Sequence, residues 1–150
     1  IRTKSGLLGA VLRTKSFKEE EAAIAKRAQE LLEYVGIGKF ADYKARTLSY
    51  GDQRRLEIAR ALATDPQLIA LDEPAAGMNA TEKVQLRELI DRIRKDNRTI
   101  LLIEHDVKLV MGLCDRVTVL DYGKQIAEGT PAEVQKNEKV IEAYLGTGGH

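Results

Sequence analysis

Residues 68–74 read LIALDEP, a short uninterrupted apolar run that ends in two acids and a proline. An apolar run without alternation is typical of a strand in a parallel sheet that helices cover on both faces. In open sheets of this kind, ligand-binding groups lie at the carboxyl ends of the strands. Asp72 and Glu73 stand at that end, so they are the first candidates for a functional site.

Apolar runs and helical patterns alternate downstream of this stretch. Residues 99–103 (TILLI) and 116–120 (RVTVL) predict two more strands, and residues 125–127 predict a short last one. Residues 79–95 carry apolar side chains at helical spacing, and residues 107–113 form a shorter helical pattern. The alternation predicts an α/β fold with a mostly parallel sheet flanked by helices.

The first part of the chain reads as helix. Apolar side chains recur at helical spacing up to Val35, and Gly36 follows where a left-handed C-cap belongs. Ser49 then opens a second helix. We therefore expect a boundary near residue 64, with a helical subdomain in residues 1–64 and an α/β part in residues 65–150.

The composition excludes several classes of protein. The chain has 150 residues, with 24 Lys and Arg against 23 Asp and Glu, so its net charge of +1 provides no polycationic field for nucleic acid. The single cysteine, Cys114, excludes an internal disulfide and a cysteine-rich metal site, and it fits a reduced thiol in the cytosol. No uncharged apolar run reaches the roughly 18 residues that a membrane span requires.

The acids at the end of residues 68–74 suit phosphoryl chemistry. A carboxylate of Asp72 can hold Mg²⁺, which prefers oxygen ligands, and Glu73 can orient or deprotonate a water that attacks a phosphoryl group. His105 follows the strand predicted at residues 99–103, so we expect it at the same edge as a phosphate contact. The alternatives are an acid pair that merely ends a strand and a histidine that is structural or exposed.

The start of the second helix is a candidate anion site. Ser49 caps this helix, whose free backbone N–H groups and dipole favour a negative charge. Gly51 allows the backbone to approach such an anion closely. The alternative is an ordinary N-cap, because serine is common at that position.

Three segments and one histidine, in this order, resemble the motifs of ATP-binding-cassette ATPases. Residues 48–63 (LSYGDQRRLEIARALA) resemble the signature motif and its helix, residues 68–74 the Walker B strand, residues 75–79 (AAGMN) the D-loop, and His105 the switch histidine. Order and spacing carry the resemblance, since each motif alone is weak. It implies a P-loop NTPase-like fold, of which this chain holds the helical subdomain and the C-terminal part of the RecA-like core.

Further segments are similar to the ATP-binding subunit of bacterial branched-chain amino acid importers. They are YGDQRRLEIARAL, DEPAAGMN, IEHDVKLVMGLCDRV and EGTPAEVQKNEKVIEAYLG, together with the start of the chain at residues 4–17. Tyr50 stands where signature motifs commonly have Gly, and Asp52 where they have Gln, which shifts Gln53 by one position. Asn79 replaces the usual aspartate of the D-loop. The resemblance includes these variants, which favour the importer subgroup.

The sequence has no match to the phosphate-binding loop G-x-x-x-x-G-K-[ST]. Gly38 and Gly123 each precede a lysine, but Glu33 and Thr118 stand where the first glycine belongs. Because the sequence also begins without Met, we expect the C-terminal part of a longer ATPase, lacking the Walker A half and inactive alone. A natural protein without this loop, acting as a regulatory or scaffold domain, is the alternative.

The resemblance implies an ATPase that couples ATP hydrolysis in a head-to-tail dimer to amino acid import. Asp72 would bind Mg²⁺, and Glu73 and His105 would be catalytic. The residues that would face the ATP of the other subunit are Ser49, Gly51, Asp52, Gln53 and Asn79. The implied partners are a second ATPase subunit, identical or paralogous, and transmembrane permease subunits, without nucleic acid. The implied location is peripheral, on the cytoplasmic face of the inner (plasma) membrane.

Two further readings stay open at this point. The first is a related cassette, such as that of a urea importer or of the lipopolysaccharide exporter. The second is a DNA-repair or chromosome-organising cassette, which usually carries long coiled coils or zinc modules. The compact helical lobe, the lone Cys114 and the net charge of +1 argue against the second reading.

Overall fold

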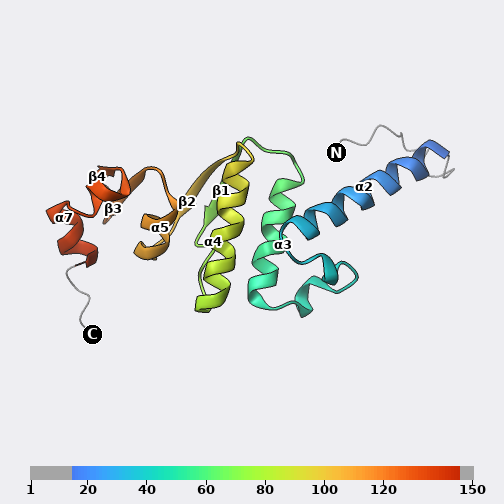
Figure 1. Ribbon diagram of the computed structural model, residues 1–150, viewed down its shortest axis with the longest axis horizontal. Coiled ribbons are helices and arrows are strands. Elements are labelled where there is room, and N and C mark those ends of the chain that lie inside the picture. Colours follow the sequence, from blue (N-terminus) through green and yellow to red (C-terminus); the bar gives the residue numbers. More distant parts are fainter. Residues whose placement is uncertain (1–14, 146–150) are drawn as a thin grey trace. The chain divides into compact units, whose positions relative to one another are not determined.

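The computed structural model describes residues 15–145 (Figure 1). The apolar stretch 7–12 and most of the segment 4–17 lie outside the described residues. The α-helices are α2 (Lys15–Tyr34), α3 (Tyr50–Leu62), α4 (Ala80–Lys95), α5 (Val107–Leu113), α6 (Pro131–Val134) and α7 (Glu138–Val140). The strands are β1 (Leu68–Asp72), β2 (Thr99–Ile103), β3 (Val117–Asp121) and β4 (Lys124–Gly129). Short helical turns are η1 (Gly38–Phe40), η2 (Ala45–Thr47) and η3 (Ile141–Leu145).

The chain divides into two compact units. Unit 1 comprises residues 1–69 and 77–99, and unit 2 comprises residues 70–76 and 100–150. The helix α4 therefore belongs to the same unit as α2 and α3. The boundary near residue 64 falls inside unit 1 and stays a prediction about the domains of the intact protein.

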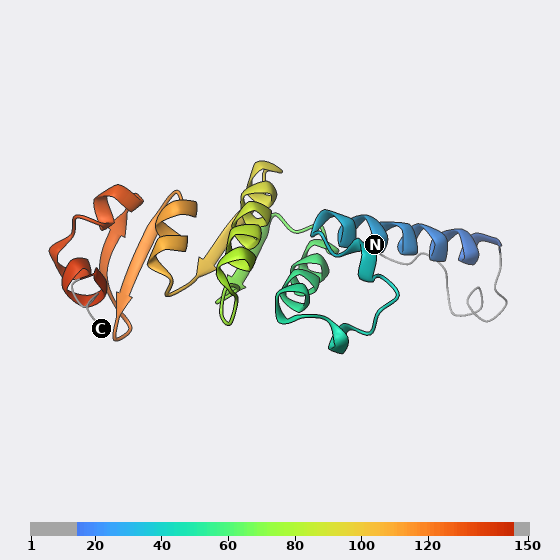
Figure 2. The same cartoon turned by 60° about the horizontal axis from the view of Figure 1, so that its bottom comes forward.

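Unit 1 is built on three amphipathic helices, and Figure 2 shows α2 (blue) beside α3 (blue-green). Gly36 ends α2 with φ of +84°, as predicted for a left-handed C-cap. Ser49 is the N-cap of α3, since its side chain accepts a hydrogen bond from the backbone N–H of Asp52. The buried side chains of the three helices are Leu31, Ile58, Ala59, Leu62, Leu86, Leu89, Ile90 and Ile93.

The strands β1 and β2 form a two-stranded sheet. The N–H of Thr99 donates to the carbonyl of Gln67 at 2.8 Å, and the N–H of Glu73 donates to the carbonyl of Ile103 at 2.8 Å. From the first hydrogen bond to the second, the residue numbers increase in both strands, so the strands run parallel, as predicted. Parallel strands end at the same edge of a sheet, and this brings the residues after β1 and β2 together.

Although we expected helices on both faces of this sheet, some apolar side chains of its strands are exposed among the described residues. Residues alternate between exposed and buried along β1, and Leu68 is 56% exposed. Leu101 and Ile103 of β2 are 54% and 52% exposed. An uninterrupted apolar run gives both faces a preference for burial, but burial itself depends on other elements.

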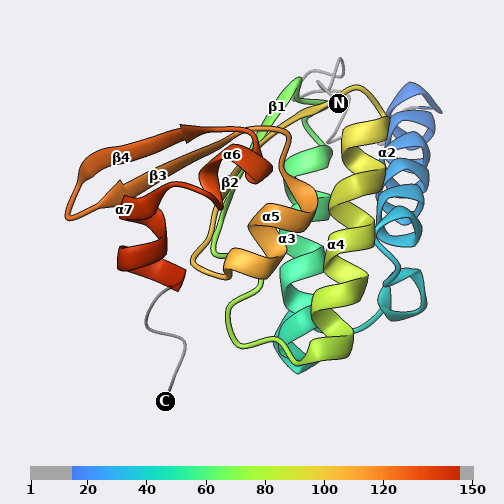
Figure 3. The same ribbon diagram turned by 60° about the vertical axis from the view of Figure 1, so that its left-hand side comes forward.

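Unit 2 contains a β-hairpin and short helices, which Figure 3 shows next to one another. The strands β3 and β4 pair antiparallel, with Val117 opposite Gly129 and Asp121 opposite Lys124. The predicted short last strand is therefore longer than expected and forms a hairpin. Val117, Val134 and Val140 are the buried centre of this unit. The sheet content is thus one parallel pair and one antiparallel pair, within the predicted α/β class.

Candidate functional site

The first cluster of candidate residues lies in unit 2, where β1 ends. Asp72 is the last residue of β1 and is exposed. Glu73 follows it with φ of +43°, a left-handed conformation that is uncommon for a residue with a Cβ. The hydrogen bond from the N–H of Glu73 to the carbonyl of Ile103 holds this turn against the end of β2. Strained residues of this kind cluster at functional sites, because surrounding structure must maintain them.

His105 lies beside Glu73, as expected from the shared edge of parallel strands. Its Nδ1 atom is 3.4 Å from Oε1 of Glu73. The His105 side chain is 71% exposed and that of Glu73 is 52% exposed, so both are open to a ligand from solvent. This distance allows a carboxylate to orient an imidazole. The structure therefore brings together the two residues predicted to be catalytic.

Glu104 also belongs to this cluster, and the sequence reasoning missed it. Its Oε1 atom accepts a hydrogen bond of 2.8 Å from the backbone N–H of Ala75. Ala75 is only 3% exposed, so Glu104 satisfies a buried donor in the turn that follows Glu73. Its only signal in the sequence is its position directly before His105, at the end of a predicted strand.

The cluster fits Mg²⁺ only in part. Among residues 15–145, no three His, Cys, Asp or Glu side chains are arranged to hold a metal ion. A protein cage for a metal is therefore lacking in the part of the chain that the structure describes. Mg²⁺ commonly takes one or two carboxylates and otherwise binds water and substrate phosphates. The exposed carboxylate of Asp72 suits that mode.

The second cluster lies in unit 1, at the start of α3. The hydroxyl of Ser49 donates to Oδ2 of Asp52 at 2.8 Å and accepts from the N–H of Asp52 at 3.2 Å. The Asp52 carboxylate thus lies in the first turn of α3, where a negative charge complements the helix dipole. The Asp52 carboxylate would repel an anion that approaches this helix end, whereas the glutamine common at this position is uncharged. Both Ser49 and Asp52 remain exposed.

Gly51 has a neighbour that the sequence did not reveal. A Cβ atom on this residue would lie 2.9 Å from Oε1 of Glu82. The Glu82 carboxylate is fixed, because it accepts from the N–H of Asn79 at 2.9 Å while Oδ1 of Asn79 accepts from the N–H of Glu82. These two bonds form the capping box of α4. A Cβ at position 51 would displace this carboxylate, so the glycine leaves room for the capping box of α4, whatever its part in anion binding.

Asn79 and Gln53 are engaged within the chain. The Asn79 side chain caps α4, as described above. The Nε2 atom of Gln53 donates to the carbonyl of Leu48 at 3.0 Å, which turns this side chain back toward the loop before α3. Each residue would have to exchange an internal hydrogen bond for a ligand contact.

Tyr50 connects the start of α3 to the segment before α4. Its ring lies 3.2 Å from the position of a Cβ on Gly77, whose φ of +72° already favours glycine. The Tyr50 hydroxyl accepts from Arg54 at 2.9 Å, and the Arg54 guanidinium lies 5.3 Å from the ring centroid. Tyr50 is thus a packing residue where signature motifs commonly have glycine. The residues of each cluster thus lie within a single unit.

Comparison with known proteins identifies the family. The model of the ABC transporter family matches residues 4–76, and that of the branched-chain amino acid ATP-binding cassette transporter matches residues 124–150. The high-affinity branched-chain amino acid transport ATP-binding protein LivG of Escherichia coli (strain K12) is 49% identical over 144 residues. The chain belongs to the ATP-binding-cassette family of ABC transporters. The cassette chain spans 56% of the length of LivG, while the match covers 95% of this chain.

Another relative and a solved structure also match this chain. BraF of Pseudomonas aeruginosa, a protein of the same description, is 45% identical to the cassette chain over 143 residues, or 95% of the chain and 56% of BraF. The crystal structure of MJ1267 in its ADP conformation, an ATP-binding cassette of an ABC transporter, matches with a TM-score of 0.76 and 32% identity. That match covers 95% of this chain and 57% of MJ1267. The predicted fold class is thereby confirmed.

None of the described helices combines the length and the apolarity that crossing a membrane requires.

Proposed function

We propose that this chain is part of the ATP-binding and ATP-hydrolysing subunit of an importer for branched-chain amino acids. The observation that carries the proposal is the Glu73–His105 pair, 3.4 Å apart on a left-handed turn that directly follows Asp72. Two carboxylates and an imidazole at one exposed edge suit hydrolysis of a phosphoanhydride. The names of LivG and BraF supply the class of cargo.

Each residue of the unit 2 cluster has a distinct part in this proposal. Asp72 would hold Mg²⁺, which would supply positive charge to neutralise the phosphates. Glu73 orients the attacking water and accepts its proton. His105 donates a hydrogen bond to the γ-phosphate, and its proximity to Glu73 fixes the orientation of the ring. Glu104 supports the turn through the N–H of Ala75.

The unit 1 cluster faces the nucleotide of a second subunit. In a head-to-tail dimer, the first turn of α3 supplies backbone N–H groups toward the γ-phosphate. The residues that we assign to this surface are Ser49, Gly51, Asp52, Gln53 and Asn79. The partner is an identical or paralogous ATPase subunit, and permease subunits hold the pair at the cytoplasmic face of the membrane.

The cassette chain alone should not hydrolyse ATP. It contains no phosphate-binding loop, so nucleotide phosphates lack the cradle of backbone N–H groups and a lysine. Calorimetry of the 150-residue chain with Mg-ATP should therefore show only feeble binding. Binding in the micromolar range would contradict the proposal that the loop comes from outside this sequence.

Transport is tested with the intact cassette that carries this chain. Reconstitution with its permease subunits in proteoliposomes should give ATP-driven accumulation of leucine, isoleucine or valine. A lipopolysaccharide-export cassette is the second candidate, because the export ATP-binding protein LptB of Escherichia coli (strain K12) is 38% identical over 120 residues. Stimulation of ATPase activity by lipopolysaccharide, without amino acid uptake, would favour that candidate.

A further inference from the structure

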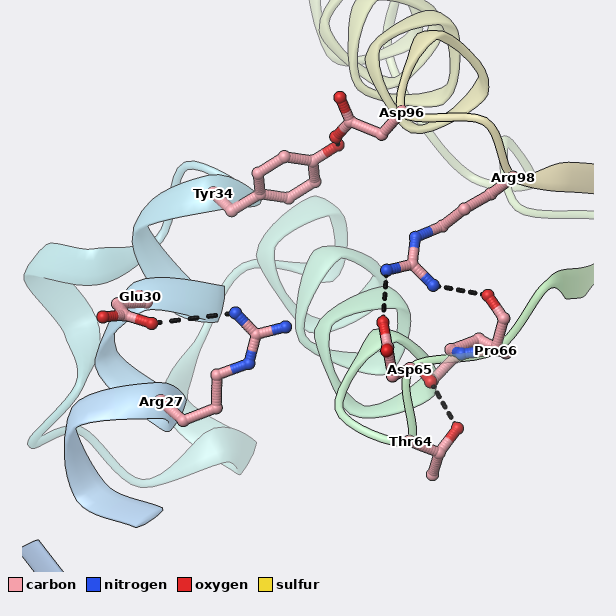
Figure 4. A network of polar contacts seen from close by, with 9 residues as sticks. Arg27, Glu30, Tyr34, Thr64, Asp65, Pro66, Asp96 and Arg98 are labelled. Atoms are coloured by element: carbon pink, nitrogen blue, oxygen red, sulfur yellow. Dashed lines mark hydrogen bonds and ion pairs between the residues drawn. The ribbon is translucent and has the colours of Figure 1, made fainter. Parts of the chain in front are cut away.

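A pocket of about 270 Å³ opens in unit 1, and none of the candidate site residues lines it. The last turns of α2 and α3 and the segment after α4 surround it (Figure 4). Its lining residues are Arg27, Glu30, Leu31, Tyr34, Leu62, Asp96 and Arg98. The volume lies just below the range of about 300–1,000 Å³ that is common for drug-sized ligands. The pocket therefore suits a ligand of the size of one amino acid.

The pocket has an apolar wall. Leu31 and Leu62 line the pocket and are 7% and 3% exposed, so the packing of unit 1 holds their side chains in place. The Tyr34 ring forms part of the same lining. An aliphatic side chain placed against this wall would lose water contact, which is favourable by about 25 cal/mol per Å² of apolar surface buried.

Some of the charged groups are already engaged. Arg98 donates to Oδ1 of Asp65 at 2.6 Å and to the carbonyl of Pro66, and its side chain is only 19% exposed. The Tyr34 hydroxyl donates to Oδ2 of Asp96 at 2.6 Å. These bonds connect the carboxyl-terminal ends of three helices. The polar groups of Arg98 and Tyr34 therefore have partners without a ligand.

Arg27 and Glu30 are different. Their charged atoms are 3.7 Å apart, which is longer than a hydrogen bond, and the side chains are 42% and 50% exposed. In Figure 4 the Arg27 guanidinium reaches from α2 toward the side of the pocket where Asp65 and Arg98 lie. Arg98 lowers the pKa of Asp65, chiefly through its hydrogen bond to that carboxylate. The positive charge of Arg27 lowers this pKa further. A guanidinium in this position can form paired hydrogen bonds with a carboxylate.

The charges of the lining cancel. Arg27 and Arg98 are balanced by Glu30 and Asp96, so the pocket does not favour a polyanion such as a nucleotide. A ligand that carries one charge of each sign can replace the long Arg27–Glu30 contact with two shorter ones. Its carboxylate would pair with Arg27, and its ammonium group would pair with Glu30.

We propose that this pocket binds a free α-amino acid with an aliphatic side chain. The site is separate from the proposed nucleotide chemistry, since it uses none of the residues assigned to that chemistry. Calorimetry without nucleotide therefore tests it alone, and its failure would leave the proposed ATPase function untouched.

The experiment is isothermal titration of the 150-residue chain with L-leucine as the probe. L-leucinamide lacks the carboxylate, 4-methylpentanoate lacks the ammonium group, and glycine lacks the side chain. We expect leucine to bind, and each of these three compounds to bind about tenfold more weakly or not at all. No heat with millimolar leucine would overturn the proposal, and so would 4-methylpentanoate binding as tightly as leucine.

Variants locate the binding. Arg27→Gln should weaken leucine binding about tenfold or more, because it removes the partner of the carboxylate. Arg60→Gln, on the exposed side of α3, is the matched control and should leave binding unchanged. Circular dichroism checks that each variant is folded, and Glu30→Gln replaces Arg27→Gln if that variant does not fold. Leucine binding that survives in the folded pocket variants takes place elsewhere and overturns the proposal.

Discussion

The Nδ1 atom of His105 lies 3.4 Å from Oε1 of Glu73, although 32 positions separate the two residues in the sequence. The parallel pairing of β1 and β2 explains this proximity, because the N–H of Glu73 donates to the carbonyl of Ile103 at the end of β2. Glu73 leaves the strand with φ of +43°, which directs the chain away from the sheet immediately after the acid pair. The relationship links the two residues to which we assign the water and the γ-phosphate.

Replacement of Glu73 tests that assignment. In the intact cassette, Glu73→Gln should keep ATP binding but slow hydrolysis about 10²–10⁴-fold, because the amide cannot accept the proton of the attacking water. Single-turnover ATPase assays measure the rate, and equilibrium binding of ATP is measured in parallel. Glu88→Gln, an exposed acid on α4, is the matched control. An unchanged turnover rate in Glu73→Gln would remove Glu73 from the role of general base.

Glu104 should act through the turn that it supports. Glu104→Ala leaves the buried N–H of Ala75 without its acceptor, which should lower the free energy of unfolding by about 1–3 kcal/mol. Glu104→Gln retains a side-chain carbonyl, so it should restore most of this loss. Urea unfolding of the 150-residue chain measures both values. Equal destabilisation by Ala and Gln would show that the hydrogen bond to Ala75 is not the cause.

The contact between Gly51 and Glu82 predicts that substitutions at these two positions have strongly coupled effects on stability. Gly51→Ala places a Cβ atom 2.9 Å from Oε1 of Glu82, which its bond to Asn79 holds in place. Overpacking of this kind should cost about 1–3 kcal/mol of stability. In a Glu82→Ala background the obstacle is absent, and the higher helix propensity of Ala should make the same change neutral or stabilising. Thermal unfolding of the four variants gives the coupling energy, and identical effects in both backgrounds would contradict the steric explanation.

Tyr34 makes stability depend on pH in the alkaline range. Burial and the hydrogen bond to Asp96 raise the pKa of Tyr34 from 10.0 to about 12. The folded state then retains a proton that the unfolded state loses, so this contribution is fully present below pH 10 and disappears as the pH rises toward 12. Urea unfolding between these pH values should show a steeper loss for the wild-type chain than for Tyr34→Phe. Parallel curves for the two proteins would mean that Tyr34 titrates normally.

Several features follow from local sequence patterns. The caps are the clearest examples: Ser49 begins α3 and Gly36 ends α2, both as predicted. The capping box of α6, formed by Thr130 and Glu133, is equally local. Cap positions depend on hydrogen bonds to the neighbouring turn, so a few adjacent residues determine them. The end of β1 at Asp72 is also encoded locally, because the apolar run is followed directly by two acids.

Contacts between distant segments could not be read in this way. The fit of Glu82 against Gly51 and of the Tyr50 ring against Gly77 requires the position of α4 relative to α3. The sequence suggested that Gly51 serves a bound anion, whereas the structure shows a second reason for a glycine there.

The sequence by itself determined the α/β class, the positions of the caps and the family resemblance carried by residues 48–105, since short patterns and their order encode these properties. Only the tertiary structure decided that Glu104 supports the turn after Glu73, that Glu82 packs against Gly51, and that three helix ends enclose a charged pocket. Hydrogen bonds and packing between side chains from separate segments exist only once the chain has folded, and no local pattern specifies their geometry.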